Sequence, residues 1–446
     1  MINKAALLFL LAAGFARTIS AQEKDIPKGI PHLDHVFVIM MENHGYQQIV
    51  GNPNEPYLNS LINSGKVNLA TNYFAIGHPS LTNYLEIVGG SNFGIRSDND
   101  PNWHSKLPCT PNIVSGTVNA DNFDGGTAPV PLDQGNICPI AGTGNDAATE
   151  AVDNWNEVTP PTFNFLANID GVKSVPAART TGISIADQLV RGGLSWKSYQ
   201  ENLPLSGPDG VNYSNGTVSN LDFDPNNPNP AAVGVKKSDV VKAYAAKHNP
   251  FVYFQSVQEG SSENNSLNNV VGFDGPRGLY ADLATGEVPS LAFIAPSQCD
   301  DQHGRGNGDK FCAFDPGLDP SGLTFGDTAG LNPELILQGD VTLERLVKSI
   351  KASLAWREGR NAIVIVWDEN DYSGLKNRGA FPLKNQNNVV LTVDTNREGG
   401  HGATSNKYYN SFSLLKSLEA AFGLPCLNHA CDSDVKVMSD LFGGGE

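Results

Sequence analysis

The segment from Ala362 to Asp371, which reads Ala-Ile-Val-Ile-Val-Trp-Asp-Glu-Asn-Asp, most constrains what this chain can fold into. Its apolar first half is rich in β-branched residues, which is typical of a strand buried on both faces of a parallel sheet. The run then ends abruptly in Asp368, Glu369 and Asp371. Three carboxylates at one strand end repel one another, and a divalent cation held by oxygen ligands would relieve that repulsion. The alternative is a solvated acidic turn after a buried strand, and this segment alone favours neither interpretation.

The order of the predicted elements indicates an α/β protein. Further strands are predicted at His35–Met41, Leu69–Ile76, Leu194–Tyr199, Phe251–Val257, Leu291–Ala295 and Val389–Val393. Helices are predicted at Tyr57–Asn63, Ser80–Ile87, Thr162–Leu166, Ser184–Arg191, Ser238–Lys247, Val341–Arg357 and Ser411–Phe422. Because strands and helices alternate, we expect a three-layer α/β/α sandwich around a mostly parallel central sheet.

The first residues read as a targeting segment. Met1 to Ala21 has a positive start, a short apolar core and a small-residue cleavage site, so we expect a signal peptide and a secreted or periplasmic protein. No later stretch is long and apolar enough to cross a membrane, so we expect a soluble protein without integral membrane association. Residues 22–446 are expected to form a single domain with long, turn-rich surface insertions at about 91–160 and 207–230.

Charge narrows the possible partners. The formal net charge of −17 argues against binding to nucleic acid or to anionic membranes. A protein this acidic that handles phosphate must supply positive charge locally, and a bound metal would do so. The six cysteines of a secreted chain suggest disulfides. Many pairings are possible, and proximity along the sequence favours Cys109–Cys138, Cys299–Cys312 and Cys426–Cys431.

Polar residues follow three of the predicted strands, at the ends that a parallel sheet brings to one edge. The three clusters are Glu42 with Asn43, Asp301 with His303, and Asp368 with Glu369. Each residue taken singly is more often a turn or cap residue, but the coincidence of three clusters favours a common site. Oxygen ligands from Glu42, Asn43, Asp368 and Glu369 would suit a hard cation such as calcium, magnesium or manganese.

Ser80 is a candidate nucleophile. It follows a His-Pro turn and opens a predicted helix, whose free amides and positive potential favour a phosphate. A metal beside Ser80 would ease formation of the alkoxide. The alternative is a simple helix N-cap, which on position alone is the more common role. Asn83, one turn further on, is a candidate donor to a phosphate oxygen. His78 and His303 are candidates for proton transfer or anion contact.

Four ordered motifs together resemble one family. They read Met-Met-Glu-Asn-His-Gly-Tyr, Gly-His-Pro-Ser-Leu-Thr-Asn-Tyr, Gln-Cys-Asp-Asp-Gln-His-Gly and Trp-Asp-Glu-Asn-Asp-Tyr-Ser. This pattern, which spans roughly residues 35–425, is similar to the phosphoesterase family. That family includes secreted acid phosphatases and nonspecific phospholipases C, and it belongs to the alkaline phosphatase superfamily. The resemblance implies an alkaline phosphatase-like fold and a phosphate-ester substrate.

The resemblance also implies a divalent metal ion. Glu42 and Asn43 match the family's first metal-binding pair, and Asp368 and Glu369 match its acidic metal pair. The ion would be calcium, magnesium, manganese or zinc, and the motifs do not choose among them.

The same resemblance assigns catalytic roles. Ser80 matches the residue that is transiently phosphorylated, and Asn83 matches the asparagine beside it. Asp301 and His303 match the motif that approaches the phosphate. His78 matches the histidine of the acid phosphatase branch, which favours a phosphatase.

One position departs from the family pattern. Ser411 stands where many relatives have histidine, so either catalysis is weakened or His401 replaces that imidazole. We expect a secreted, metal-dependent phosphomonoesterase, similar to acid phosphatases, that works through a phosphoserine intermediate. The alternatives are a phospholipase C-type phosphodiesterase and a secreted phosphate- or metal-binding protein without turnover. The oligomeric state is not predicted.

Overall fold

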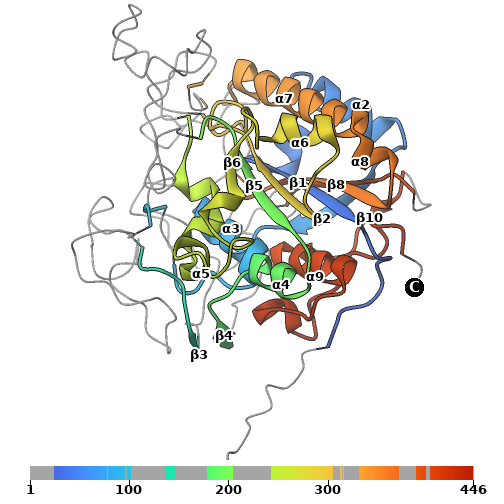
Figure 1. Ribbon diagram of the computed structural model, residues 1–446. Helices are drawn as coiled ribbons and strands as arrows, with labels where there is room; N and C mark the ends of the chain where they lie inside the picture. Colours follow the sequence, from blue (N-terminus) through green and yellow to red (C-terminus); the bar gives the residue numbers. More distant parts are fainter. Residues whose placement is uncertain are drawn as a thin grey trace, which may run out of the picture.

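The computed structural model describes residues 25–77, 79–95, 98–101, 137–145, 178–203, 243–304, 312–313, 315, 331–370, 388–397 and 402–444. These residues form a nine-stranded sheet with the strand order β10-β2-β9-β8-β1-β7-β5-β6, in which β11 also pairs with β2 (Figure 1). Its strands are β1 (His35–Met41), β2 (Asn68–Phe74), β5 (Trp196–Gln200), β6 (Val270–Gly272), β7 (Leu291–Ala295), β8 (Asn361–Trp367), β9 (Val389–Thr395), β10 (Thr404–Ser405) and β11 (Tyr409–Asn410).

The sheet is mostly parallel, as predicted. Strands β8, β1, β7, β5 and β6 run parallel to one another, and β9 is antiparallel to both β8 and β2. Every residue of β7 and β8 is buried, and so is all of β1 except His35. This two-sided burial explains why the central strands read as continuous apolar runs instead of alternating ones.

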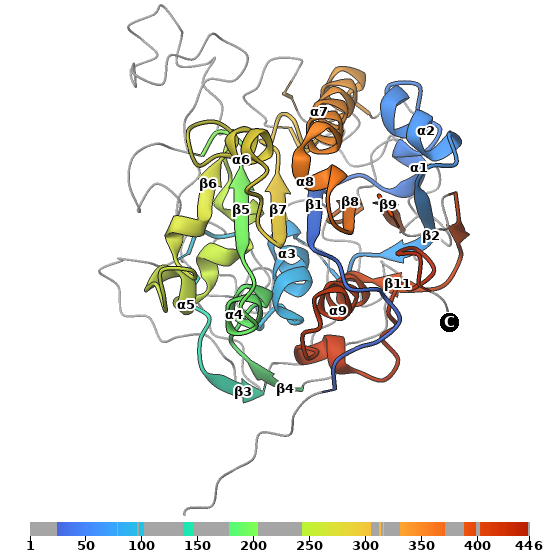
Figure 2. The ribbon, with the colours of Figure 1, turned by 45° about the vertical axis from the view of Figure 1, so that its right-hand side comes forward.

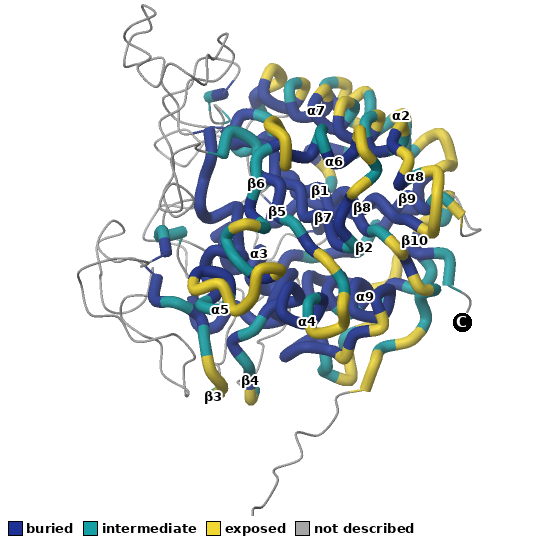
Figure 3. The backbone as a smooth tube through the Cα atoms, in the orientation of Figure 1, coloured by how far each residue is buried: buried dark blue, intermediate teal, exposed yellow. Residues whose placement is uncertain are grey.

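Helices cover both faces of the sheet (Figures 1 and 2). One layer holds α2 (Pro56–Asn63), α6 (Leu279–Thr285), α7 (Pro333–Ala352) and α8 (Leu354–Arg357), and the other holds α3 (Ser80–Gly89), α4 (Ile185–Arg191) and α9 (Ser411–Phe422). Buried residues run through the sheet and the inner sides of the helices, while the outer turns of α7 are exposed (Figure 3). The three-layer α/β/α architecture is therefore confirmed. Other short elements are α1 (Tyr46–Ile49), α5 (Gln255–Gln258) and a separate antiparallel pair of strands, β3 (Thr143–Asn145) and β4 (Arg179–Thr181).

The strand predicted at Phe251–Val257 is wrong. The chain instead forms a 3-10 helix, η6 (Pro250–Tyr253), followed by α5. Pro250 is the first residue of η6, where its fixed φ suits a helical turn and its missing N–H costs nothing. Phe251 and Phe254 are fully buried and pack edge-on against Phe293 and Phe93, respectively. The apolar run therefore reflects burial and not a strand.

Two helix predictions need correction, and two others fall outside the described residues. Residues 243–245 of the helix predicted at Ser238–Lys247 are not helical; a 3-10 helix, η5 (Ala246–His248), follows, and residues 238–242 are outside the described part. The helix predicted at Val341–Arg357 is two helices, because Ser353 ends α7 and caps α8 through its side chain. The helix predicted at Thr162–Leu166 and the insertion at 207–230 lie outside the described residues. Within the insertion predicted at 91–160, Ile137 and Ile140 are fully buried.

The cysteine pairings are confirmed where they are described. Disulfides join Cys299 to Cys312 and Cys426 to Cys431. Cys138 is also disulfide-bonded, while Cys109 and the predicted signal segment 1–21 lie outside the described residues. In the part of the chain that is described, no helix has both the length and the apolar character needed to cross a bilayer.

Candidate functional site

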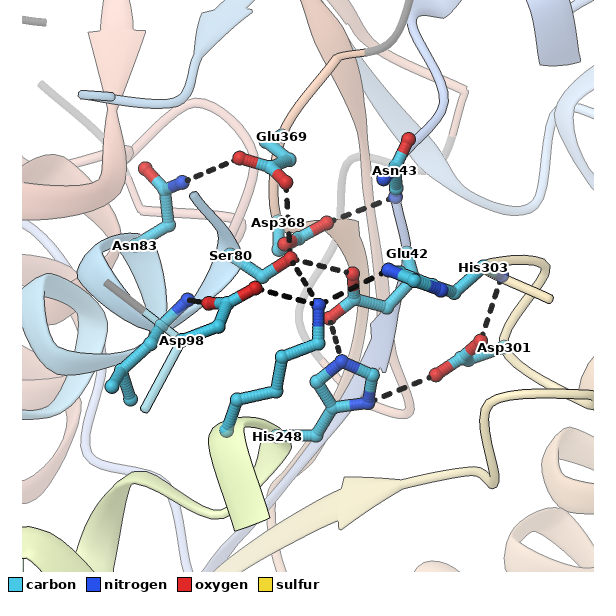
Figure 4. Close-up of polar contacts among 12 residues, drawn as sticks. Glu42, Asn43, Ser80, Asn83, Asp98, His248, Asp301, His303, Asp368 and Glu369 are labelled. Atoms are coloured by element: carbon cyan, nitrogen blue, oxygen red, sulfur yellow. Dashed lines mark hydrogen bonds and ion pairs between the residues drawn. The ribbon is translucent and has the colours of Figure 1, made fainter. Parts of the chain in front are cut away.

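The polar clusters after β1, β7 and β8 meet at one edge of the sheet (Figure 4). Strands β1 and β8 pair in parallel with Met41 beside Trp367, so Glu42 and Asp368 follow at the same level. The backbone N–H of Glu42 donates to the carbonyl oxygen of Asp301, 2.8 Å away, which joins the segment after β7 to the same edge. The convergence predicted from the three strand ends is therefore present.

Ser80 lies between two of these carboxylates. Its Oγ is 3.1 Å from Glu42 Oε2 and 3.0 Å from Glu369 Oε1, and all three side chains are fully buried. A hydroxyl has one proton, so it donates to only one of the two carboxylates at a time. Ser80 is the first residue of α3, while Pro79 holds the N-cap position. The N-cap alternative considered for Ser80 is therefore not its role here.

Glu42, Asp368 and Glu369 form a carboxylate cluster that fits a cation. Ligand oxygens of the three residues lie within 4.8 Å of one another. Asp368 Oδ1 accepts from the backbone N–H of Asn43 at 2.9 Å, while the buried Oδ2 has no hydrogen-bond partner. Burial and then the charges of Glu42 and Glu369 raise the pKa of Asp368 well above its ordinary value. A set of carboxylate oxygens suits a hard divalent cation, which would remove this mutual repulsion.

His248 is a site residue that the sequence analysis missed. Its Nε2 lies 3.0 Å from Glu42 Oε1 and its Nδ1 lies 3.1 Å from Asp301 Oδ2. The ring stacks on Tyr84 of α3, with the ring centroids 5.4 Å apart and the planes 4° apart. Burial alone would lower the pKa of His248, but the facing carboxylates raise it to about 9. An imidazolium here balances two carboxylates at once.

The same pairing affects the facing carboxylates. Burial alone would raise the pKa of Glu42, but the charges of His248 and Lys247 hold it well below its usual range. Glu42, His248 and Asp301 also have the composition and spacing of a metal site. A metal at that position would need the imidazole to lose its proton, so it would compete with the ion pairs that the structure shows.

Lys247, also missed from sequence, brings a second basic group to Ser80. Its Nζ lies 2.9 Å from Asp98 Oδ2, 3.1 Å from His303 Nε2 and 3.3 Å from Ser80 Oγ. Two adjacent basic residues, Lys247 and His248, stand before an apolar run of chain. That unusual juxtaposition is the sequence signal that could have identified them.

The remaining predicted residues differ in what they contact. Asn83 holds the turn before Ser80, because its Oδ1 accepts from the backbone N–H groups of Ile76 and Gly77 at 3.0 and 3.2 Å. Its Nδ2 reaches Glu369 Oε2 only at 3.5 Å. Asn43, at a φ of 60°, contributes its backbone N–H to the cluster. Its role as a side-chain metal ligand stays a prediction.

His303 is held with a defined orientation. Its Nδ1 lies 2.8 Å from the carbonyl oxygen of Gly304, so Nδ1 carries the proton and Nε2 accepts from Lys247. Burial and then the charge of Lys247 lower the pKa of His303 to about 3.

Ser411 is buried at the first residue of α9. Three residues named from the sequence, His78, Asp371 and His401, lie outside the described part of the chain.

Gln302 connects the site to the fold behind it. It has a φ of 81°, and it lies between Asp301 and His303 in the sequence. Its Nε2 donates to Glu55 Oε2 at 2.7 Å, and its Oε1 accepts from Trp367 Nε1 at 3.0 Å. The strained backbone of Gln302 is thus fixed by Glu55, the N-cap of α2, on one side and by Trp367, the last residue of β8, on the other.

We expect Glu55→Gln to reduce the pH dependence of stability. Burial and the charge of Asp340 raise the pKa of Glu55 well above 4.5, so the folded state keeps a proton that the unfolded state loses. The free energy of unfolding therefore falls as pH rises from about 4.5 towards the folded pKa, by up to about 1.4 kcal/mol per pH unit. Glutamine keeps the shape and the bond to Gln302 without titrating.

Urea unfolding of both proteins at several pH values measures this effect. The exposed Glu287→Gln serves as the control and should leave the slope unchanged. Equal slopes for the parent protein and Glu55→Gln would contradict the assignment of a buried, protonated Glu55.

Comparison with known proteins gives one consistent family. The sequence profile of the Phosphoesterase family matches residues 52–313. A phosphatidylinositol-3-phosphatase from Mycobacterium tuberculosis is 31% identical, over 93% of this chain and 84% of that protein. An acid phosphatase from Aspergillus fumigatus is 22% identical, over 88% of this chain and 55% of that protein.

The chain is thus considerably shorter than the fungal enzyme, of which it spans a little over half the length. Among solved structures, a protein in the alkaline phosphatase superfamily from Vibrio parahaemolyticus matches 91% of this chain and 72% of its own, with a TM-score of 0.41 and 10% identity.

Proposed function

Because this chain belongs to the Phosphoesterase family, we propose that it hydrolyses phosphate monoesters through a phosphorylated Ser80. The observation that carries this proposal is the position of Ser80 Oγ, 3.1 Å from Glu42 Oε2 and 3.0 Å from Glu369 Oε1 at the first residue of α3. A serine hydroxyl is a weak nucleophile unless a neighbouring base or cation activates it. Here two carboxylates are within reach of its proton.

The residues of the chain have separable tasks in this mechanism. Glu42, Asp368 and Glu369 would hold a divalent cation, which supplies Lewis-acid stabilisation of a phosphoryl oxygen and of the serine oxygen. Ser80 Oγ attacks phosphorus as its proton passes to Glu369, the bond from phosphorus to the ester oxygen breaks, and the alcohol leaves with a proton taken from solvent. Asn83 keeps the preceding turn in place so that Oγ stays aimed at the cluster. Water then hydrolyses the phosphoserine and restores Ser80.

A monoester fits this site better than a phospholipid diester. The named activities of the two relatives described above are both phosphatase activities. A monoester dianion carries one more charged oxygen than a diester, and the site offers the basic group of Lys247 beside Ser80 to meet it. A hydrogen bond to a charged group contributes about 1.5–3 kcal/mol, which corresponds to roughly 10- to 100-fold in rate.

A comparison of three substrates tests the proposal. Protein incubated with magnesium, manganese or calcium is assayed with p-nitrophenyl phosphate, bis(p-nitrophenyl) phosphate and phosphatidylcholine. We expect kcat/KM for the monoester to exceed that for the diester by roughly 10- to 100-fold. Phosphatidylinositol 3-phosphate is a fourth substrate to include, because the Mycobacterium relative is named for it. Preferred cleavage of either diester would favour a phospholipase C-type enzyme, and phosphate binding without turnover would favour a binding protein.

We also propose that the protein works in an oxidising compartment outside the cytoplasm. The support is the pair of disulfides, Cys299–Cys312 and Cys426–Cys431, since such bonds persist mainly in secreted and periplasmic proteins. The Cys299–Cys312 bond brackets the loop that begins with Asp301 and His303, so reduction should loosen one side of the site.

A further inference from the structure

We propose that Lys247 is a catalytic residue whose ammonium group binds a non-bridging oxygen of the transferring phosphoryl group beside Ser80. This inference rests on the proposed function and adds to it a permanent protein cation opposite the carboxylate cluster. Neither the polar strand ends nor the family motifs quoted above include Lys247, which comes from η5, on a different segment of the chain.

Lys247 is held so that one of its protons faces the nucleophile. An ammonium group has three N–H donors. Asp98 Oδ2 accepts one at 2.9 Å, His303 Nε2 accepts another at 3.1 Å, and Ser80 Oγ lies 3.3 Å from the same nitrogen. The side chain is nearly buried, so these contacts fix the position of Nζ.

Asp98 ties this lysine to the helix that carries the nucleophile. Its Oδ1 accepts from the backbone N–H of Leu81 at 3.1 Å, while its Oδ2 pairs with Lys247. One carboxylate therefore sets both the first turn of α3 and the lysine ammonium. The distance between Ser80 Oγ and Lys247 Nζ is defined by a short chain of contacts, which is the preorganisation that electrostatic catalysis requires.

The charge around Ser80 shows why this cation is needed. Glu42 and Glu369 both contact Ser80 Oγ, and Asp368 lies in the same cluster. A phosphate dianion approaching these carboxylates would be repelled unless cations intervene. His248 directs both ring nitrogens at carboxylates, so its charge is already engaged. Lys247 is the basic side chain of the described site whose nitrogen directly reaches the nucleophile.

The geometry also indicates which atoms of the substrate the Lys247 ammonium would contact. When the bond from Ser80 Oγ to phosphorus forms, the non-bridging oxygens lie two bonds from Oγ. The N–H that faces Oγ in the free protein can then donate to one of them without movement of the side chain. Charge on these oxygens is spread and stabilised in the transition state, so a fixed ammonium should lower the barrier as well as bind phosphate.

Lys247→Met tests this role because it keeps the length of the side chain and removes the charge. We expect kcat/KM for p-nitrophenyl phosphate to fall about 100- to 1,000-fold, the usual loss for one electrostatic contact to the reacting group. We expect the affinity for inorganic phosphate, measured by calorimetry on manganese-loaded protein, to fall at least about tenfold. Manganese affinity should stay the same or rise, since a neighbouring positive charge is removed.

Lys197→Met is the matched control. Lys197 also forms an ion pair, with Asp282 of α6, and its ammonium contacts Asp282 and the carbonyl oxygen of Arg277 instead of Ser80. Its loss should change the melting temperature but neither kcat/KM nor phosphate affinity. As a second variant, Lys247→Ala should regain part of its lost activity when methylammonium is added, which a purely structural lysine would not show.

The outcomes separate this inference from the proposed function. If the parent protein hydrolyses the ester and Lys247→Met matches it in kcat/KM and phosphate affinity, Lys247 is structural and the inference is wrong. If the parent protein hydrolyses nothing but loses phosphate affinity on Lys247→Met, the proposed function fails while phosphate binding by Lys247 stands. An equal loss of phosphate affinity in Lys197→Met would also overturn the inference.

Discussion

Ser80→Ala is expected to lower kcat for a phosphomonoester by at least about 10⁴-fold, because removing a nucleophile leaves only the contribution of binding and electrostatics. The folded structure should persist. Ser80 is not the N-cap of α3, so its hydroxyl does not hold the helix start. Stopped-flow or steady-state assays with p-nitrophenyl phosphate give the rate, and circular dichroism gives the fold.

Trapping the phosphorylated protein tests the role of Ser80 without relying on the rate measurement. Acid quenching during turnover should leave phosphate on the peptide containing Ser80 in the parent protein and none in Ser80→Ala. Ser417→Ala is the matched control, because Ser417 is equally buried but bonds to Ser413 and Met438 within and beside α9. It should lose stability without losing activity. Turnover of Ser80→Ala at the parent rate would exclude Ser80 as the nucleophile.

Removal of the divalent cation is expected to be the second large effect. Chelation should lower kcat at least about 10³-fold, since Lewis-acid stabilisation of transition-state charge contributes several kcal/mol. Adding back magnesium, manganese or calcium should restore activity. A ligand that binds only the folded state also stabilises it, by about 2.7 kcal/mol at a concentration 100 times its Kd. The melting temperature should therefore rise on reloading, whether or not substrate is present.

Asp368→Asn assigns that cation to the carboxylate cluster. Asp368 Oδ2 is buried without a hydrogen-bond partner, so this oxygen can be a ligand to the cation without losing a protein contact. The variant should bind metal at least about tenfold more weakly by calorimetry, and elemental analysis after dialysis should show the loss. Asp282→Asn, which alters a carboxylate paired with Lys197 and Tyr199, should retain its metal. Full metal content in Asp368→Asn would place the cation elsewhere.

Burial patterns made the central fold predictable. The apolar runs of β1 and β8 are rich in β-branched residues and, like the shorter run of β7, are continuous, which favours strands buried on both faces. The same reasoning failed at Phe251–Val257, where Phe251, Val252 and Tyr253 are buried in a 3-10 helix and not in a strand. A short apolar run reports burial, and the backbone conformation there depends on which neighbours the side chains meet.

Part of the site was predictable from the sequence, namely the residues that follow strands. Glu42, Asp301 and Asp368 directly follow or lie close after strands, so their meeting at one edge follows from a parallel sheet. Lys247 and His248 follow no strand and lie within the short 3-10 helix η5. No periodicity marks a residue that enters a site from such a segment. Asn83 was selected by its spacing from Ser80; its side-chain oxygen bonds to the turn before Ser80, and its role as a donor to phosphate stays a prediction.

The sequence by itself determined the layered α/β architecture, the two described disulfides and the acidic edge of the sheet. Each of these follows from local composition or from the regular geometry of parallel strands. Only the tertiary structure decided how the charges are balanced, because balance depends on which side chains approach within about 3–4 Å across distant segments. Asp98, Lys247 and Ser80 are separated by up to 167 positions in the chain, yet they form one connected set of contacts. Long-range packing, which no local pattern encodes, places a cation beside the nucleophile.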